Sequence, residues 1–341
     1  MKTYFTGLDI LRFLAALGVV NFHYFLGLTD KLSWYRYGNL GVQLFFMISG
    51  FVIAQSVAHA SLKTFAIGRF IRLFPIFWIL CSVTYIFTLL MPNGVPVSFP
   101  EYIISMTMLG DKLSTALGYG GIVDPSYWTL AVELIFYTAI GIFVALFSWK
   151  NIRYFLWGWL FVSALSFLFS LDQTFLAKLL LVRHASYFIL GVTLMLILTD
   201  TSSAKQKCID KLLLTVTLVY ATCISFVALP PYFIPNKLDD ILIAAMHPVL
   251  FALMCIFIYI SRYMTSQKHI RIYTAIGGMT YPLYLLHQTI GRTLLDYFKD
   301  YTTHLTRGTI LIVIMILISY VVYVYDKKMR SYLTKKLLPR K

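Results

Sequence analysis

Residues 8–27, LDILRFLAALGVVNFHYFLG, form an apolar stretch long enough to cross a lipid bilayer as one helix. A spanning helix needs about 20 mainly apolar residues, each rising about 1.5 Å. Arg12 and His23 interrupt the stretch, and their spacing returns them to one helix face about 16 Å apart. Ionisable side chains inside a membrane face protein or water and often mark a functional path. Two interpretations are open: a functional pair, or an Arg12–Asp9 interfacial pair with His23 as a packing residue.

Apolar runs of similar length recur along the chain. Of its 341 residues 59% are hydrophobic and 13% charged, against about 25% charged in average proteins, and the mean hydropathy is +0.77. This composition excludes a soluble globular domain, and long continuous runs favour helices over a β-barrel. We therefore predict an all-α integral membrane protein, with 1–341 as a single transmembrane domain and no appended extramembrane domain. The ten expected spans are 8–26, 38–58, 70–91, 126–148, 152–171, 183–199, 212–229, 240–260, 275–297 and 309–325.

The basic residues are unevenly distributed between the two sides that these spans define. Of the 29 Lys and Arg residues, 19 fall on the side of both termini and Arg12 lies within a span. The other side has nine: Lys31, Arg36, Lys112, Lys178, Arg183, Lys237, Arg292, Lys299 and Arg307. Because Lys and Arg favour cytoplasmic loops, both termini are predicted to be cytoplasmic. The net charge of +15 then reflects topology and requires no nucleic-acid partner, and the basic tail 327–341 is expected to lie against the anionic inner leaflet.

Two further features limit the function. The four cysteines lie far apart and show no CxxC spacing, so neither a metal site nor a disulfide framework is predicted. The longest outer connection, 92–125, contains the short apolar piece 102–109, which is too short to span and is expected to be re-entrant or interfacial.

Arg69 and Arg72, in the cytoplasmic stretch 63–78, are spaced i, i+3. On a helix they point the same way, and two planar guanidinium groups on one face suit a phosphate group. The alternative is an ordinary basic flank of a membrane span. Pro75 predicts a kink or a helix restart just beyond the pair.

Two later spans contain buried polar side chains. Glu133 is expected about 10 Å below the outer surface, and an ionised carboxylate at that depth requires a partner. His287 is expected about 18 Å from the inner surface, so His23, Glu133 and His287 are predicted to share one layer on three different helices. Such a layer is what a buried polar site requires. Tyr137 follows Glu133 on the same face, and Trp128 is typical of a membrane interface.

Five motifs in order resemble the acyltransferase type 3 family of bacterial membrane O-acyltransferases, in a form without an SGNH domain. These motifs are LDILRFLAALGVVNFH (8–23), GVQLFFMISGFVI (41–53), RFIRLFP (69–75), YWTLAVELIFY (127–137) and MTYPLYLLH (279–287). Two positions depart from the pattern: Gln43 stands where many relatives have Asp, and Leu134 where many have Glu.

The resemblance implies transfer of an acyl group, typically acetyl from acetyl-CoA, to a hydroxyl of a carbohydrate at the bacterial inner membrane. The acceptor is expected to be a surface polysaccharide, an O-antigen or a lipid-linked sugar, and no metal is expected. The implied residues are His23 as general base with Arg12 and Glu133 as catalytic residues, Arg69 and Arg72 at acyl-CoA, and Trp128, Tyr137, Tyr284 and His287 at the substrate. For His287 a packing role is also expected, so its substitution should weaken activity less than substitution of His23. A neutral imidazole is suited to removing the proton of a sugar hydroxyl as it attacks the thioester.

Two other functional classes fit the same composition. A secondary transporter also has many spans, buried charges and helices interrupted by glycine or proline, but its halves should resemble each other, which is not seen here. A component for exporting polysaccharide precursors needs no acyl-CoA site, which would leave RFIR as a topology signal.

Overall fold

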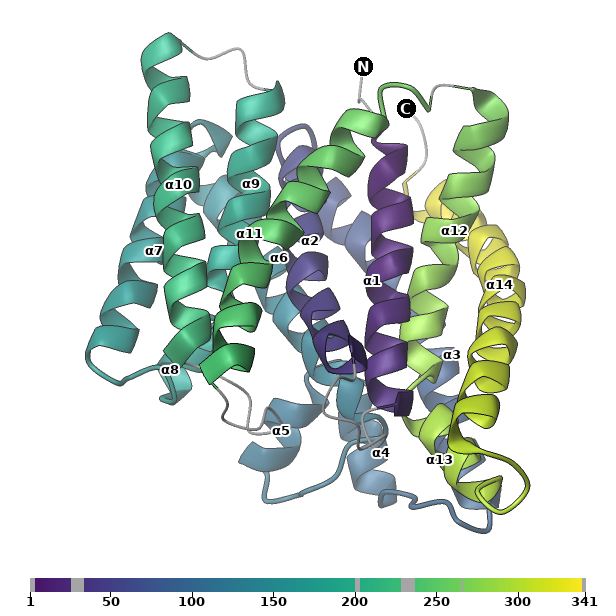
Figure 1. The fold of residues 1–341 in the computed structure, drawn as a ribbon. Coiled ribbons are helices and arrows are strands. Elements are labelled where there is room, and N and C mark those ends of the chain that lie inside the picture. Colours follow the sequence, from purple (N-terminus) through teal and green to yellow (C-terminus); the bar gives the residue numbers. More distant parts are fainter. Residues whose placement is uncertain (1–3, 26–33, 200–202, 228–236, 265, 339–341) are drawn as a thin grey trace. The chain divides into compact units, whose positions relative to one another are not determined.

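The computed structural model describes residues 1–341 except 1–3, 26–33, 200–202, 228–236, 265 and 339–341. Every regular element in these described ranges is a helix (Figure 1), so the predicted all-α fold is confirmed. The chain groups into two compact units. Unit 1 comprises 1–42, 66–134 and 261–341, and unit 2 comprises 43–65 and 135–260. Lys2, Lys31, Arg340 and Lys341, which entered the prediction of topology, lie outside the described residues.

Unit 1 holds the helices that carry most of the predicted site. They are α1 (Thr6–Phe25), η1 (Trp34–Leu40), most of α3 (Leu62–Leu90), α4 (Phe99–Ser105), α5 (Gly110–Ala116), η2 (Pro125–Tyr127), the start of α6 (Trp128–Phe147), α12 (Gln267–Leu286), α13 (Thr289–Tyr297) and α14 (His304–Leu337).

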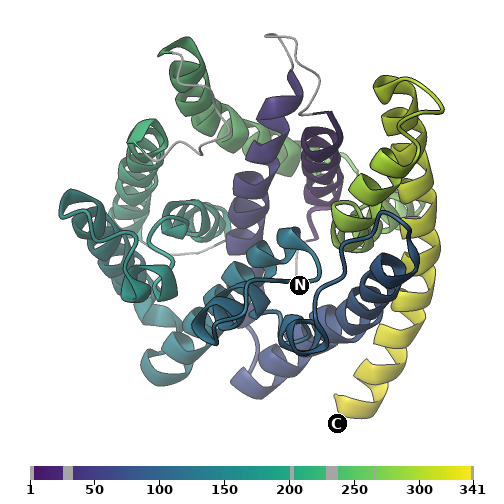
Figure 2. The same cartoon turned by 90° about the horizontal axis from the view of Figure 1, so that it is seen from below.

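In unit 1, α12 packs against both α1 and α14, and α14 runs along its outer side in both views (Figures 1 and 2). The buried apolar side of α1 repeats at helical spacing through Leu8, Leu11, Ala15, Val19 and Phe22. This stripe fixes the rotation of α1 against its neighbours and therefore the direction of its polar residues.

Unit 2 is a bundle built around α9. Its elements are most of α2 (Gly41–Val57), the remainder of α6, η3 (Trp149–Asn151), α7 (Ile152–Leu168), α8 (Phe175–Leu179), α9 (Ala185–Thr199), α10 (Ala204–Val227) and α11 (Lys237–Ile260). Twelve consecutive residues of α9 are buried, and α9 packs against α7 and α10. The Arg153 guanidinium lies 2.7 Å from the Asp210 carboxylate and joins α7 to α10.

Six of the described helices are long and apolar enough to cross a membrane, and two more are apolar but shorter. The six are Thr6–Phe25, Tyr35–Val57, Leu62–Leu90, Pro125–Phe147, Ala204–Ser225 and His304–Leu337, and the shorter two are Ala185–Thr199 and Ala245–Ile260. The class of multi-pass helical membrane protein therefore stands. The count of ten spans and the cytoplasmic placement of both termini stay predictions.

The prediction of one continuous helix over 275–297 is wrong. The segment is divided into α12, which ends at Leu286, and α13, which begins at Thr289. In an α-helix the Thr289 N–H would donate to the Leu285 carbonyl. Instead it donates to the Asp124 carboxylate at 2.8 Å, and the Tyr127 hydroxyl donates to the Leu285 carbonyl at 3.4 Å. Side chains next to the start of α6 thus satisfy the backbone groups that the break exposes.

Three other expectations concern local structure. The stretch 102–109 begins in the short helix α4 and ends in the turn before the short helix α5, and neither helix is long enough to span. Pro75 lies inside α3, which continues through it, so Arg69 and Arg72 occupy one uninterrupted helix. The last helix, α14, extends over 34 residues into the basic tail as far as Leu337.

Candidate active site

His23 and His287 come together in unit 1. His23 lies in the last turn of α1, and His287 is the cap residue directly after the end of α12 at Leu286. The centroids of their imidazole rings are 5.2 Å apart, and the ring planes are tilted by 48°. His287 is completely buried, whereas His23 is partly exposed. The two histidines that were predicted to share a layer are therefore neighbours.

The tautomer of neutral His287 follows from its hydrogen bond. Its Nδ1 lies 2.8 Å from the carbonyl oxygen of Tyr284. A carbonyl oxygen only accepts, so Nδ1 carries the hydrogen and Nε2 of the neutral ring has a lone pair. That Nε2 is buried and makes no hydrogen bond to any residue that the structure describes. A buried acceptor without a partner is costly, which points to a group that binds there.

Asp124 is a site residue that the sequence reasoning missed. It is completely buried just before η2, and its Oδ1 accepts hydrogen bonds from the Ser126 amide at 2.8 Å and the Ser126 hydroxyl at 2.6 Å. Its Oδ2 accepts from the Thr289 amide. The Asp124 carboxylate interacts electrostatically with His287 and with Tyr24, the residue after His23. An Asp before Pro is the common start of a helix, so the available signal indicated a cap only.

Tyr284 lies between the turn at Asp124 and Glu133. Its hydroxyl accepts from the Thr129 hydroxyl at 2.8 Å and donates to the Ser126 carbonyl at 3.2 Å. Glu133, one turn beyond Thr129 on α6, interacts electrostatically with Tyr284 and is partly exposed. Of the predicted residues, Glu133 therefore lies close to Tyr284, which in turn lies one turn before His287.

Two predicted aromatic residues have different positions. Trp128 is the first residue of α6 and is partly exposed, close in sequence to the Asp124 turn. Tyr137 belongs to unit 2, where it is buried and its ring lies 5.9 Å from that of Phe136. The structure thus gives no support for placing Tyr137 at the histidine pair.

The predicted arginines lie toward the other end of α1. Arg12 pairs with Asp9 at 3.9 Å, which confirms the pairing that the sequence allowed. Asp9 also accepts a hydrogen bond from the Tyr4 hydroxyl and interacts electrostatically with Arg72 of α3. The charges of Arg12 and Arg72 thus both act on the Asp9 carboxylate, and Arg69 lies one turn before Arg72 on the same helix.

The family is decided by a model of an acyltransferase domain, which matches residues 5–324. The chain belongs to this acyltransferase family. As a member it is an enzyme that transfers acyl groups, and its long apolar helices agree with a multi-pass membrane protein.

Curated relatives match part of this acyltransferase. Nodulation protein 10 of Rhizobium leguminosarum bv. viciae is 31% identical over 167 residues, 42% of this chain and 45% of that protein. Peptidoglycan O-acetyltransferase OatA of Listeria monocytogenes is 26% identical over 162 residues, 43% of this chain and 25% of that protein. The matched regions cover less than half of either relative. No solved structure matches the chain.

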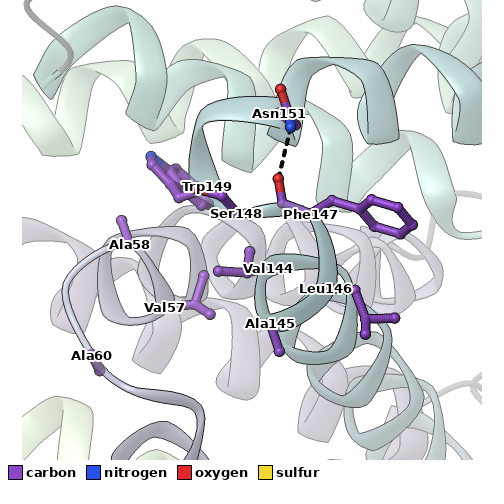
Figure 3. A pocket seen from close by; sticks show the side chains of 10 residues that line it. All are labelled: Val57, Ala58, Ala60, Val144, Ala145, Leu146, Phe147, Ser148, Trp149 and Asn151. Atoms are coloured by element: carbon purple, nitrogen blue, oxygen red, sulfur yellow. Dashed lines mark hydrogen bonds between the residues drawn. The ribbon is translucent and has the colours of Figure 1, made fainter.

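A hollow in unit 2 of the acyltransferase is lined by none of the predicted site residues. It has a volume of about 630 Å³ and lies beside the turn that joins α6 to α7 (Figure 3). Val57, Leu146 and Trp149 are among its lining residues, and the Asn151 side-chain amide donates to the Phe147 carbonyl at 2.7 Å. Since none of its lining residues is ionisable, acid–base chemistry at this hollow is not supported.

Proposed function

We propose that this chain transfers an acyl group, acetyl in the simplest case, from acyl-CoA to a hydroxyl of a cell-surface or lipid-linked carbohydrate. The family supplies the reaction class, and the name of the Listeria relative supports an O-acetyl product. The observation that carries the proposal is the His23–His287 pair, because it joins a partly exposed imidazole to a buried one with an unused lone pair. The proposed setting is the cytoplasmic membrane of a bacterium.

His23 acts as the general base. Its imidazole removes the proton of the acceptor hydroxyl while the oxygen attacks the thioester carbonyl carbon. The new carbon–oxygen bond forms, the carbon–sulfur bond breaks, and the proton passes to the sulfur of CoA. Nε2 of His287 accepts a hydrogen bond from a neighbouring hydroxyl of the sugar and orients it. Glu133 and Tyr284 border this acceptor side.

The arginines bind the donor at the other end of α1. Arg69 and Arg72 hold phosphates of CoA with their planar forks of donors, and Arg12 lies on the path between them and the histidines. Arg12 and His23 are about 16 Å apart along the helix, so the extended pantetheine arm must cover most of this distance.

Membership of an acyltransferase family favours this function over the two other classes. A transporter would use the same buried charges to bind a passing solute, and an export component would leave Arg69 and Arg72 unused.

The direct test is ester-linked acetate on surface glycan, measured in a strain that lacks the gene and in the same strain complemented with wild type or His23→Gln. Only wild type should restore the acetate. The purified protein in nanodiscs should move labelled acetyl from acetyl-CoA to that glycan. Equal acetate in the deletion and parent strains would argue against the proposal.

A further inference from the structure

A second group of charged side chains lies in unit 1, around the N-terminal half of α1. It contains two ion pairs: Arg12 with Asp9 at 3.9 Å, and Arg330 with Asp326 at 2.9 Å. Arg330 and Asp326 lie on α14 beyond residue 324, where the family match ends. This second pair therefore lies outside the matched residues, and the function proposed above does not use it.

Two adjacent glycines of α12 bring the pairs close to one helix. A Cβ on Gly277 would collide with the side chain of Asp9, and one on Gly278 with the ring of Tyr323. Consecutive helix residues point about 100° apart, so α1 and α14 each approach α12 closely on its own side. Tyr323, Asp326 and Arg330 follow one face of α14 at spacings of three and four, so Arg330 continues the face that packs against α12.

Arg72 joins the same group from α3. The Tyr281 hydroxyl of α12 donates to the carbonyl of Leu73 at 3.2 Å, which holds α3 against α12 next to Arg72. The charge of Arg72 acts on Asp9, on Asp326 and on Arg330. Helices α1, α3 and α14 thus contribute charges to one region.

Three cations and two carboxylates of the described residues interact in this region. Arg12 pairs with Asp9 and Arg330 with Asp326, and the charge of Arg72 acts on both carboxylates. The Asp326 side chain is 3% exposed, whereas the Arg330 side chain is 29% exposed and can reach solvent. A guanidinium has five N–H donors, so its pairing with one carboxylate leaves donors for a second anion. Two arginines at one place suit phosphate oxygens better than lysines would, because of their fixed fork.

We propose that Arg330 and Arg72 form one binding site for phosphate groups. The inference rests on the proposed function in that acyl-CoA, which carries a diphosphate and a phosphate monoester, supplies such groups. Phospholipid headgroups carry the same chemistry at a membrane surface. Asp326 holds Arg330 in position, so the site exists before a ligand arrives.

The test uses 3′,5′-ADP, the phosphate-bearing end of CoA without its acyl arm. Its binding to the purified protein in phosphatidylcholine nanodiscs is measured by calorimetry. Arg330→Gln should weaken binding about tenfold or more, the usual effect of removing one charge-assisted contact. Lys328→Gln is the matched control, because it removes the same charge two residues before Arg330. The Lys328 side chain is exposed, and its Nζ lies over the Tyr325 ring, 5.8 Å from the ring centroid.

A second variant guards against misfolding, since Arg330→Gln leaves the buried Asp326 carboxylate without its partner. The double variant Arg330→Gln/Asp326→Asn removes both charges and should show the same loss of 3′,5′-ADP binding with a normal elution profile. Unchanged binding of both 3′,5′-ADP and anionic lipid in this double variant would overturn the proposal.

Two further arms identify the source of the phosphate. If CoA is the ligand, the variants lose kcat/KM with acetyl-CoA but keep it with acetyl-pantetheine, which has no phosphate. If lipid is the ligand, 3′,5′-ADP binding is unchanged and the variants retain less phosphatidylglycerol from mixed nanodiscs, as counted by native mass spectrometry. Absence of turnover with either donor in wild type would contradict the proposed function, while the binding measurements would still decide the role of Arg330.

Discussion

The imidazole rings of His23 and His287 lie 5.2 Å apart, although one belongs to the first helix and the other to the end of α12. The helix breaks directly after His287, where the Asp124 carboxylate accepts from the Thr289 amide and holds the start of α13. The candidate chemistry therefore rests on three segments from distant parts of the chain.

Replacing His23 tests the general base. His23→Gln should reach the membrane in normal amounts and bind donor normally, but lose acyl transfer by at least about a hundredfold, because the proton of the acceptor has no base. Transfer is measured in nanodiscs with normalised protein. Near-normal turnover would end this assignment and move the role to Glu133 or His287.

Substitution by Asn and by Gln separates the roles of the two ring nitrogens of His287. His287→Asn keeps an N–H near the position of Nδ1, so the bond to the Tyr284 carbonyl can form, but it removes Nε2. We expect it to fold and to lose about tenfold or more in kcat/KM for the acceptor, a larger effect than a packing histidine predicts. His287→Gln, which places an amide near Nε2, should recover part of the loss. Equal, near-normal activity of both variants would return His287 to a packing role.

The arginine pair of α3 should control donor affinity. Arg69→Ala and Arg72→Ala should each weaken acyl-CoA binding by roughly ten- to a hundredfold, because losing one charge-assisted contact costs about 1.5–3 kcal/mol, and the double variant should weaken it further. Lysine at both positions should rescue only partly, because an ammonium lacks the bidentate fork. Lys63→Ala, an exposed charge on the same helix, is the control. Unchanged CoA binding in the double variant would refute the role.

Asp124 should contribute to stability as well as to the site. Asp124→Asn keeps one acceptor oxygen and leaves a buried amide donor in place of the other, so the free energy of unfolding should fall by about 1–3 kcal/mol. Denaturant unfolding in detergent measures the change. Asp172→Asn is the control, because its partner Arg183 is 42% exposed and such surface pairs contribute about 0–1 kcal/mol. Similar losses in both variants would contradict the structural role of Asp124.

Glu101 should make the connection between α3 and α6 sensitive to acid. Hydrogen bonds from the Ser98 side chain and amide and from the Gly121 amide lower the pKa of the Glu101 carboxyl. A lowered folded-state pKa stabilises the closed loop above the unfolded pKa of about 4.3, and this stabilisation is lost as the pH falls through the lower value. Limited proteolysis should cut the connection faster at the lowest pH tested. In Glu101→Gln the rate of proteolysis should vary with pH only as the activity of the protease does. An equal acid response in wild type and in Glu101→Gln would exclude Glu101 as the cause.

The apolar runs predicted the helices, because each run had to satisfy its own backbone hydrogen bonds. The depth of His23 and His287 likewise follows from counting residues along a helix, and their contact agrees with it. The division between α12 and α13 was not predictable in this way. It needs acceptors and donors from Asp124 and Tyr127, and nothing near 287 in the sequence shows that they are present.

The same limit applies to the charged residues. Arg12 and Asp9 are one turn apart, so their pair could be predicted from spacing. Arg330 was expected to be one of many basic residues of a tail at the membrane surface. Its position near Arg72 depends on the length of α14 and on two glycines of α12, which only the packed helices reveal.

The interruption after His287 also separates changes in the length of α13 from changes in the position of the His287 ring. In a continuous helix, inserting one residue beyond His287 would rotate everything that follows by about 100° relative to the histidine. Because α13 is attached through Asp124 and not through an unbroken helix, its length and orientation can vary without turning His287 away from His23. A change in the length of α13 should therefore leave the rings of His23 and His287 in contact.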